Sequence, residues 1–131
     1  AAGSMLAAAA LALTIEGFAD WYIPSRDELE LVYRHFKPAD EENYADGLDG
    51  VNASSTPAGA AYTEAAPGQT DVETFKAGGA DAMDDYWHWS STQSAPDPSH
   101  AWFQGFDGGY QFYDFTSYAG RARAVRRLII Q

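Results

Sequence analysis

The chain contains no cysteine. This absence excludes a disulfide framework, a zinc site built on thiolates and a cysteine nucleophile, and it leaves the redox compartment undecided. Basic residues are also scarce, since eight Lys and Arg stand against 19 Asp and Glu for a formal net charge of −11. A surface so short of positive charge is poorly suited to neutralise phosphates, which disfavours nucleic acid and anionic membranes as partners.

Long apolar runs are missing as well. The longest, residues 5–13, is about half the length that a bilayer requires, so we expect no membrane insertion. The three histidines stand apart from one another, and no His-Glu-x-x-His, EF-hand or phosphate-cradling glycine motif occurs. We therefore expect no metal, no cofactor and no enzymatic activity. A hydrolase would need a polar cleft with a perturbed carboxylate, and it is the last of the alternatives that we consider.

What the chain does have is the size and composition of one packed domain. Of its 131 residues, 46% are hydrophobic and 15% aromatic, which is enough for a core without covalent cross-links. Residues 1–5 look like vector-derived sequence, so we expect a single domain over residues 6–131. The excess of acidic residues lies between Pro38 and His100, whereas four arginines are crowded after residue 120. These arginines fit either a phosphate site or ion pairs with acidic loops, and we favour the ion pairs.

Helix signals dominate the first part of the chain. Residues 6–13 are rich in Ala and Leu and predict a short helix. Ser25 is followed three residues later by Glu28, which is a capping box and predicts that a second helix begins there. That helix must end before Pro38, because the residue before a proline avoids the helical conformation.

A long loop and a short helix are expected next. Residues 39–68 carry many small and polar residues without periodicity, which predicts a loop. Thr70 and Glu73 form a second capping box, which predicts a short helix that ends at Gly78.

From Tyr86 onward the sequence alternates with a period of two, which predicts strands. Asp107-Gly108 between two aromatic runs is typical of a β-hairpin, and residues 122–130 predict a last strand. Helices followed by antiparallel strands indicate an α+β domain.

Residues 94–118 divide into two interleaved sets. The frame set, with bulky rings for a core and glycine for a turn, is Ala101, Trp102, Gln104, Phe106, Gly108 and Gln111. The display set is Ser94, Asp97, Ser99, His100, Phe103, Gly105, Asp107, Gly109, Tyr110, Phe112, Tyr113, Asp114, Phe115, Ser117 and Tyr118. Its members are all Ser, Asp, His, Phe, Gly or Tyr, the types that changes of adenine alone can produce from the asparagine codon AAC. Lys, Glu, Gln, Met and Trp cannot arise in this way and are absent from the display set.

The display set has the chemistry of a binding surface. Tyr and Phe give rigid contact area at small entropic cost, while Ser, Gly and Asp provide adaptable hydrogen bonds. An aromatic β core would account for any single ring of the set, but not for all of them, because the tryptophans and Phe106 already fill a small interior. Residues 112–115 place rings on both faces of a strand. We therefore expect several of these rings to be exposed, and exposed aromatic clusters mark binding surfaces.

Four blocks of sequence resemble a known family. They are residues 20–29 (DWYIPSRDEL), 89–93 (WSSTQ), 101–111 (AWFQGFDGGYQ) and 120–128 (GRARAVRRL). In these blocks the chain is similar to the C-type-lectin-fold domains of phage and prophage proteins, many of which are variable proteins of diversity-generating retroelements. The resemblance implies a C-type-lectin-like α+β fold with two to three helices, a small mainly antiparallel sheet and long loops.

In that family an error-prone reverse transcriptase rewrites adenine positions in the last part of the gene, and the fold holds the variable side chains on one exposed face. The resemblance implies a non-enzymatic module that binds a host-surface protein or another macromolecular ligand, from a phage tail or a bacterial cell surface. Gly109 fits either the frame or the variable positions. The ligand-binding residues implied by the resemblance are Ser99, His100, Phe103, Gly105, Asp107, Tyr110, Phe112, Tyr113, Asp114, Phe115, Ser117 and Tyr118.

The chain departs from the sugar-binding members of the lectin fold. The Glu-Pro-Asn, Gln-Pro-Asp and Trp-Asn-Asp triplets of calcium-dependent sugar lectins are absent, so neither calcium nor carbohydrate is implied. Fold relatives that form formylglycine depend on cysteines, which this chain lacks. The competing hypothesis is a structural tail or surface domain whose aromatic patch packs against a neighbouring domain or subunit. Oligomerisation is left open by the sequence.

Overall fold

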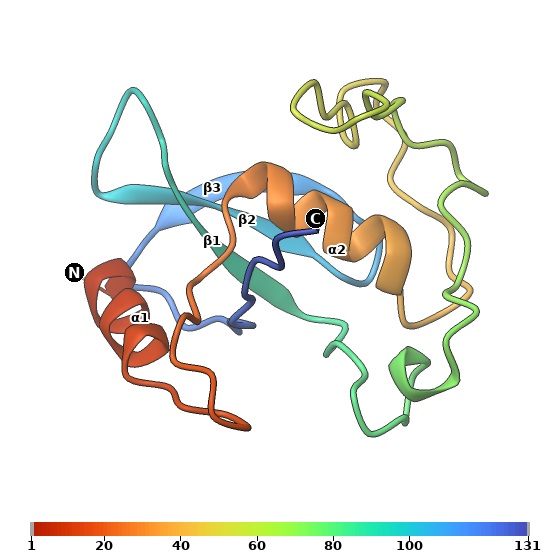
Figure 1. The fold of residues 1–131 in the computed structure, drawn as a ribbon. Coiled ribbons are helices and arrows are strands. Elements are labelled where there is room, and N and C mark those ends of the chain that lie inside the picture. The colour runs from red at the N-terminus through yellow and green to blue at the C-terminus, as the bar shows by residue number, and fades with distance from the viewer. Residues whose placement is uncertain (1, 131) are drawn as a thin grey trace.

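A computed structural model describes residues 2–130 of the chain and the side chains of residues 6–130. The elements are α1 (Ala2–Leu11), α2 (Arg26–Phe36), η1 (Glu73–Phe75), β1 (Trp87–Gln93), β2 (His100–Gly105) and β3 (Gln111–Phe115) (Figure 1). The strands form one antiparallel sheet in the order β1-β2-β3. The expected α+β class, with few helices, a small antiparallel sheet and long loops, is confirmed.

The capping box predicted for α2 is present. The Ser25 hydroxyl accepts a hydrogen bond from the Glu28 backbone N–H at 3.2 Å, and the Glu28 carboxylate accepts one from the Ser25 N–H at 2.9 Å. The helix ends at Phe36, two residues before Pro38, as the sequence requires. Its buried side includes Leu29 and Tyr33, which face the sheet.

One face of the sheet, here called the α1 face, packs against α1. Trp89 of β1 pairs with Phe103 of β2, and Phe103 pairs in turn with Phe112 of β3, so these three side chains lie on the same face. Trp89, Ala101 and Phe103 are buried there, and Leu6 of α1 packs against them.

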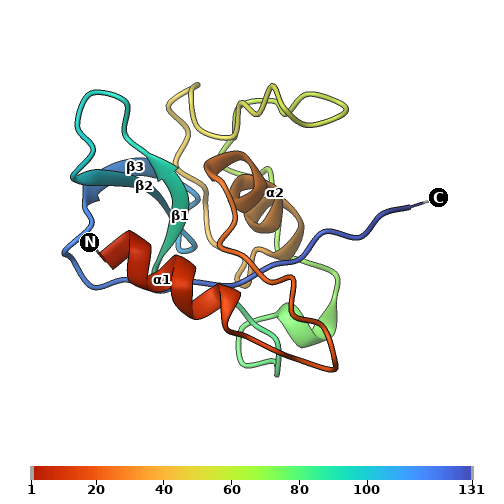
Figure 2. The ribbon, with the colours of Figure 1, turned by 60° about the vertical axis from the view of Figure 1, so that its left-hand side comes forward.

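The opposite face, here called the α2 face, is covered by α2, which crosses the sheet in Figure 1 and stands apart from α1 in Figure 2. His88 of β1 and Gln104 of β2 pair on this face. The His88 ring lies 4.4 Å from the ring of Phe106, at the end of β2. The core beneath the helix consists of Leu29, Tyr33, Tyr62, Met83 and Phe106.

Hydrogen bonds fix the long loop between α2 and β1. The Tyr62 hydroxyl donates to the Glu30 carboxylate of α2 at 2.9 Å and accepts from the Gln104 side-chain amide of β2 at 3.0 Å. The Tyr33 hydroxyl of α2 donates to the Asn43 side chain at 2.6 Å. Burial raises the pKa of both tyrosines, so both hydroxyls stay protonated and able to donate. The loop is therefore held to the helix and to the sheet by buried side chains.

Two predictions for this region have different outcomes. Residues 39–68 contain neither helix nor strand, as predicted. The capping box at Thr70 is wrong, because the Thr70 hydroxyl accepts from the Val72 N–H instead and the Glu73 carboxylate pairs with Lys76. Without a cap, the segment forms only the single turn of η1. The helix predicted over residues 6–13 is also displaced, since α1 begins earlier and ends at Leu11.

The C-terminal segment forms isolated bridges instead of the strand predicted over residues 122–130. Arg121 exchanges backbone hydrogen bonds with β1, whereas Val125 exchanges them with Tyr22, before α2. Because these two partners belong to different parts of the fold, the segment pairs with each at a single position and does not continue one ladder. Three of the four arginines of this segment pair with acidic side chains: Arg121 with Asp84 at 3.0 Å, Arg126 with Asp20 at 2.8 Å, and Arg127 with Glu28 of α2 at 3.0 Å. Arg123 donates to backbone carbonyls instead.

The division between core and surface rings predicts unequal stability losses. Phe103 is 3% exposed and Phe112 is 55% exposed, although the two side chains pair across β2 and β3. Phe103→Ala should lower the free energy of unfolding by about 3–5 kcal/mol because it leaves a cavity, and Phe112→Ala by less than about 1 kcal/mol. Urea denaturation of both variants measures the difference, and equal losses would contradict the assignment of Phe103 to the core.

His88 predicts a pH dependence of stability. Burial lowers its pKa below the ordinary value of 6.5, and its Nδ1–H donates to the Tyr86 carbonyl at 3.1 Å. The unfolded chain therefore binds a proton at a higher pH than the folded chain, so stability is fully present above about pH 6.5 and falls as the pH drops toward the folded pKa.

The loss can reach about 1.4 kcal/mol per pH unit within that window. Urea unfolding at pH 7.5 and pH 5.5 should show a larger loss for the wild type than for His88→Gln, which cannot take up the proton. The carboxylates contribute equally to both proteins, so the same loss in each would rule out His88 as the source.

Candidate functional site

The rings of β3 lie on both faces of the sheet, as predicted. The register places Phe112 and Asp114 on the α1 face, and Tyr113 and Phe115 on the α2 face. Phe112 is 55% exposed, Phe115 45%, and Tyr118, in the turn after the strand, 50%. The prediction that several rings of the display set face solvent is therefore confirmed.

On the α2 face, two exposed and three half-buried rings form an edge cluster, defined as His100, Trp102, Tyr113, Phe115 and Tyr118. The His100 ring lies 4.2 Å from the Phe115 ring and 6.0 Å from the Tyr113 ring, between centroids. Trp102 meets Tyr113 edge-on at 5.1 Å, and Phe115 meets Tyr118 in the same way at 5.8 Å. These contacts hold the rings in place while leaving part of each one exposed.

Trp102 was expected in the core, and the structure corrects this. Its ring is only half-buried, and the Arg26 guanidinium lies over it, 3.6 Å from the ring centroid. Trp102 is on the α2 face, next to Arg26, the first residue of α2. The guanidinium of Arg26 covers the ring in place of an apolar side chain, which would have buried it. Phe103, one residue later, takes the core position on the other face.

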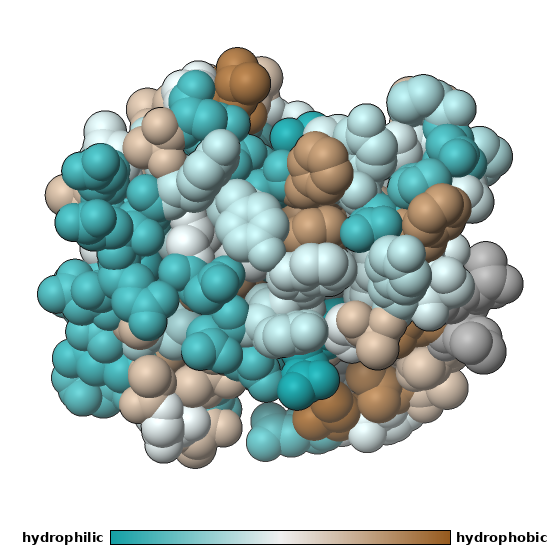
Figure 3. Space-filling model, turned by 180° about the vertical axis from the view of Figure 1, so that it is seen from behind, coloured by the Kyte–Doolittle hydropathy of each residue, from teal (hydrophilic) through white to brown (hydrophobic). Residues whose placement is uncertain are grey.

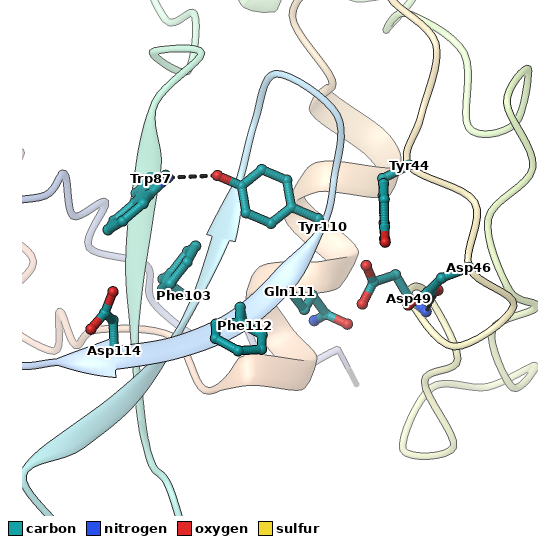
Figure 4. A pocket seen from close by; sticks show the side chains of 9 residues that line it. All are labelled: Tyr44, Asp46, Asp49, Trp87, Phe103, Tyr110, Gln111, Phe112 and Asp114. Atoms are coloured by element: carbon teal, nitrogen blue, oxygen red, sulfur yellow. Dashed lines mark hydrogen bonds between the residues drawn. The ribbon is translucent and has the colours of Figure 1, made fainter.

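On the α1 face, an aromatic pocket of about 560 Å³ opens between β1, β2, β3 and the long loop (Figure 4). Its lining consists of Tyr44, Asp46, Asp49, Trp87, Phe103, Tyr110, Gln111, Phe112 and Asp114. Figure 3 views the molecule from behind Figure 1, where pale and brown side chains gather near the middle and the lower right, while hydrophilic ones dominate the left.

Three rings of the aromatic pocket are fixed against one another. Trp87 and Phe103 are stacked with centroids 4.3 Å apart, and Tyr110 stands perpendicular to Phe103 at 5.9 Å. The Trp87 indole N–H donates to the Tyr110 hydroxyl at 2.6 Å, the bond drawn in Figure 4. Since each ring is set by two neighbours, this wall of the aromatic pocket is rigid before any ligand arrives.

The carboxylates of the aromatic pocket are held by backbone N–H groups. Asp46 accepts from the Leu48 and Asp49 N–H groups, both at 2.8 Å, and these bonds lower its pKa. Asp114 accepts from the N–H of the next residue at 2.8 Å. Asp49 is 5% exposed, and burial raises its pKa while a bond from the Gln111 N–H opposes that shift. Within residues 2–130, none of the three forms an ion pair with Lys or Arg.

Two residues of the predicted site are not displayed. Phe103 is buried at the base of the aromatic pocket, in the core formed with Trp89. Gly105 is also buried, and a Cβ at this position would overlap the ring of Tyr110 and approach Asp107. The expectation that these two positions face solvent is wrong, because both lie on the α1 face of the central strand, which is covered by α1 and by the rings of Trp87 and Tyr110.

The structure resolves the choice that was open for Gly109. Its φ is +77°, a conformation that favours glycine, and an added Cβ would overlap the rings of Tyr33 and Tyr62. Gly109 therefore belongs to the frame.

The remaining predicted residues flank the edge cluster and the aromatic pocket in the sequence. Asp107, in the β2–β3 turn, and Ser117, after β3, are exposed. Ser99 is exposed beside the edge cluster and donates to Asp97 at 2.7 Å. Ser94, the first member of the display set, is buried and its hydroxyl has no partner among the described residues.

Sequence reasoning missed the loop side of the aromatic pocket. Tyr44, Asp46 and Asp49 come from the aperiodic segment 39–68, where nothing in the sequence indicates which residues return to the sheet. Within residues 2–130, no three His, Asp or Glu side chains gather as metal ligands would. Neither described helix has the length and apolar character needed to cross a bilayer.

The assignment of Gly109 to the frame predicts a clear contrast with an exposed neighbour. Gly109→Ala should lower the free energy of unfolding by about 1–3 kcal/mol, because the methyl group overpacks the core at a strained φ. Ser117→Ala should change it by less than about 0.5 kcal/mol. Thermal unfolding of the two variants tests this, and a fully stable Gly109→Ala protein would return that position to the display set.

The comparisons with known proteins give one family. The family model of the Lcl C-terminal domain matches residues 2–126. This range includes both helices, the whole sheet, the edge cluster and the aromatic pocket. No curated protein and no solved structure matches the chain.

Proposed function

The chain belongs to the Lcl C-terminal domain family, and from this membership and the exposed rings we propose that it is a non-enzymatic module that recognises a receptor on a host-cell surface. The family supports the broader statement, a ligand-binding or surface module. The recognition surface consists of the exposed part of β3 with its flanking turns. Phe103 and Gly105 are not part of this surface, because both residues are buried.

The observation that carries the proposal is the exposure of Phe112, Phe115 and Tyr118 over a packed frame. Large rings that stay in water cost solubility and stabilise little, so clusters of them mark binding surfaces. Contacts within the edge cluster and the aromatic pocket hold the rings before binding, so a partner has little side-chain entropy to remove. Exposed Ser99, Asp107 and Ser117 add hydrogen-bonding groups nearby.

The finer proposal is that the module is a C-type-lectin-like variable protein of a diversity-generating retroelement, carried on a phage tail or a bacterial cell surface. The small polar and aromatic composition of the display set supports it. The genomic test is a near-copy of the last part of the gene that differs only at adenines. Related copies should differ at the codons of Phe112, Tyr113 and Phe115 and not at that of Gly109.

The alternative is a structural domain whose aromatic patch packs against a neighbouring domain or subunit. The same exposed rings would then be an interface. Sedimentation velocity over a range of protein concentrations separates the two, because association that depends on residues 110–118 favours the structural role.

A cell-binding experiment tests the proposed function directly. The fluorescently labelled domain is titrated onto intact cells of the bacterial strain that carries the gene and of its relatives. The double variant Phe115→Ala, Tyr118→Ala should bind at least tenfold more weakly, because truncation of central aromatic anchors typically costs more than about 1.4 kcal/mol.

The matched control is Leu48→Ala, Val51→Ala, which removes two apolar side chains that are 74% and 56% exposed on the long loop. This double variant should bind like the wild type. Equal binding by both double variants would contradict the assignment of the surface.

A further inference from the structure

The aromatic pocket combines ring faces with carboxylates. Trp87, Phe103 and Tyr110 form one rigid wall, and Phe112, largely exposed, stands beside them. Aromatic faces carry a partial negative charge and attract cations that approach them. The loop side of the same cavity is lined by Asp46 and Asp49. Both walls of the aromatic pocket therefore favour positive charge.

Asp49 makes this preference stronger. The residue is 5% exposed, and within residues 2–130 its carboxylate has a backbone N–H partner but no ion-pair partner. A buried carboxylate without an ion-pair partner is costly, and the charge of Arg26 is the least of the effects that act on Asp49, so a cation that enters the aromatic pocket offsets part of that cost. Asp46 and Asp114, which line the same cavity, add to the attraction.

The chain's own basic residues are engaged elsewhere. Five of the eight Lys and Arg form ion pairs outside the aromatic pocket. Lys37 and Arg123 donate to backbone carbonyls. The charge of Arg26 acts on Asp49, but the guanidinium lies over Trp102 on the α2 face. A cation for the aromatic pocket must therefore come from another molecule.

The polar groups of the lining indicate which kind of ligand fits. The three carboxylates only accept hydrogen bonds, and the Tyr110 hydroxyl already accepts one from Trp87. Donors are few, namely the Gln111 amide and the tyrosine hydroxyls. A sugar hydroxyl needs both donors and acceptors, whereas an ammonium or guanidinium group carries donors only. An acceptor-rich, donor-poor cavity with aromatic walls is therefore better matched to an organic cation than to a sugar.

We propose that the aromatic pocket binds a basic side chain, Lys or Arg, presented by the protein partner of this module. The inference rests on the proposed function and names the chemistry that this surface recognises. The cavity of about 560 Å³ has room for the side chain and part of its backbone. The alkyl stem lies against the rings and the charged end lies near the carboxylates. The net charge of −11 also attracts a basic partner from a distance.

The test uses the full chain labelled with ¹⁵N and three small probes: N-acetyl-lysine methylamide, N-acetyl-arginine methylamide and the neutral N-acetyl-norleucine methylamide. The indole N–H resonance of Trp87, assigned with Trp87→Phe, reports on the aromatic pocket because this group bonds to Tyr110. The two cationic probes should shift that resonance until it saturates, with dissociation constants at least tenfold lower than that of the norleucine probe. Added salt should weaken both, because the attraction is partly between charges.

Charge-removing variants localise the effect. Asp114→Asn keeps the side-chain oxygen that accepts from the Phe115 N–H, so the fold should persist, but the affinity for the cationic probes should fall at least fivefold. The matched control is Asp97→Asn, whose carboxylate accepts from the Ser99 N–H at the same 2.8 Å but lies outside the lining. It should change the affinity less than twofold. Asp46→Asn is the second pocket variant, should Asp114→Asn fail to fold.

Three results would overturn the proposal: no saturable shift at Trp87, equal affinity for norleucine, or a shift with methyl glycosides in place of the cationic probes. If cells still bind through Phe115 and Tyr118, the proposed function survives and only the cation assignment fails. If the cationic probes bind at the aromatic pocket but cells do not bind, the pocket stands and the proposed receptor role fails.

Discussion

Tyr62 joins three parts of the molecule that the sequence keeps far apart. Its hydroxyl bonds to Glu30 on α2 and to Gln104 on β2, while its backbone belongs to the long loop. Because the ring is buried, these bonds form in a low dielectric and would be costly to leave unmade. The position of the loop, and with it Tyr44, Asp46 and Asp49 beside the sheet, depends on this anchor together with the Tyr33–Asn43 bond and the bond from the Tyr44 N–H to the Gly108 carbonyl. The aromatic pocket therefore depends on buried hydrogen bonds in the core, because these bonds hold its loop side beside the sheet.

The sequence predicts those elements whose signals are local. The capping box of Ser25 locates α2, and Asp107-Gly108 locates the hairpin between β2 and β3. Alternation also separates the side chains of β2 into two groups, but it does not say which group is buried. The sequence therefore favours Trp102 for the core and Phe103 for the surface, whereas in the structure Phe103 is buried and Trp102 is half-buried beneath Arg26. The prediction of a strand over residues 122–130 is wrong, because the backbone partners of this segment are set by tertiary contacts that the local sequence does not encode.

The sequence predicts the candidate site only where its residues follow one another in the chain, as they do in β3. The rings of β3 could be expected on the surface because the segment holds more aromatics than a small interior admits. The acidic side of the aromatic pocket comes from residues 44–49, more than 60 positions before Phe112. Segment 39–68 has no periodicity, so only the folded chain reveals that it returns to the sheet.

The place of β3 at the end of the strand order has a consequence for how the protein can change. Within residues 2–130 it shares a ladder with β2 alone, so new side chains on its exposed positions leave the pairing of β1 with β2 untouched. Selection on mutations at the exposed positions of β3 therefore acts mainly through what the domain binds. Mutations on the central strand β2 are selected first for their effect on folding. A lineage could revise its recognition repeatedly without having to rebuild its interior.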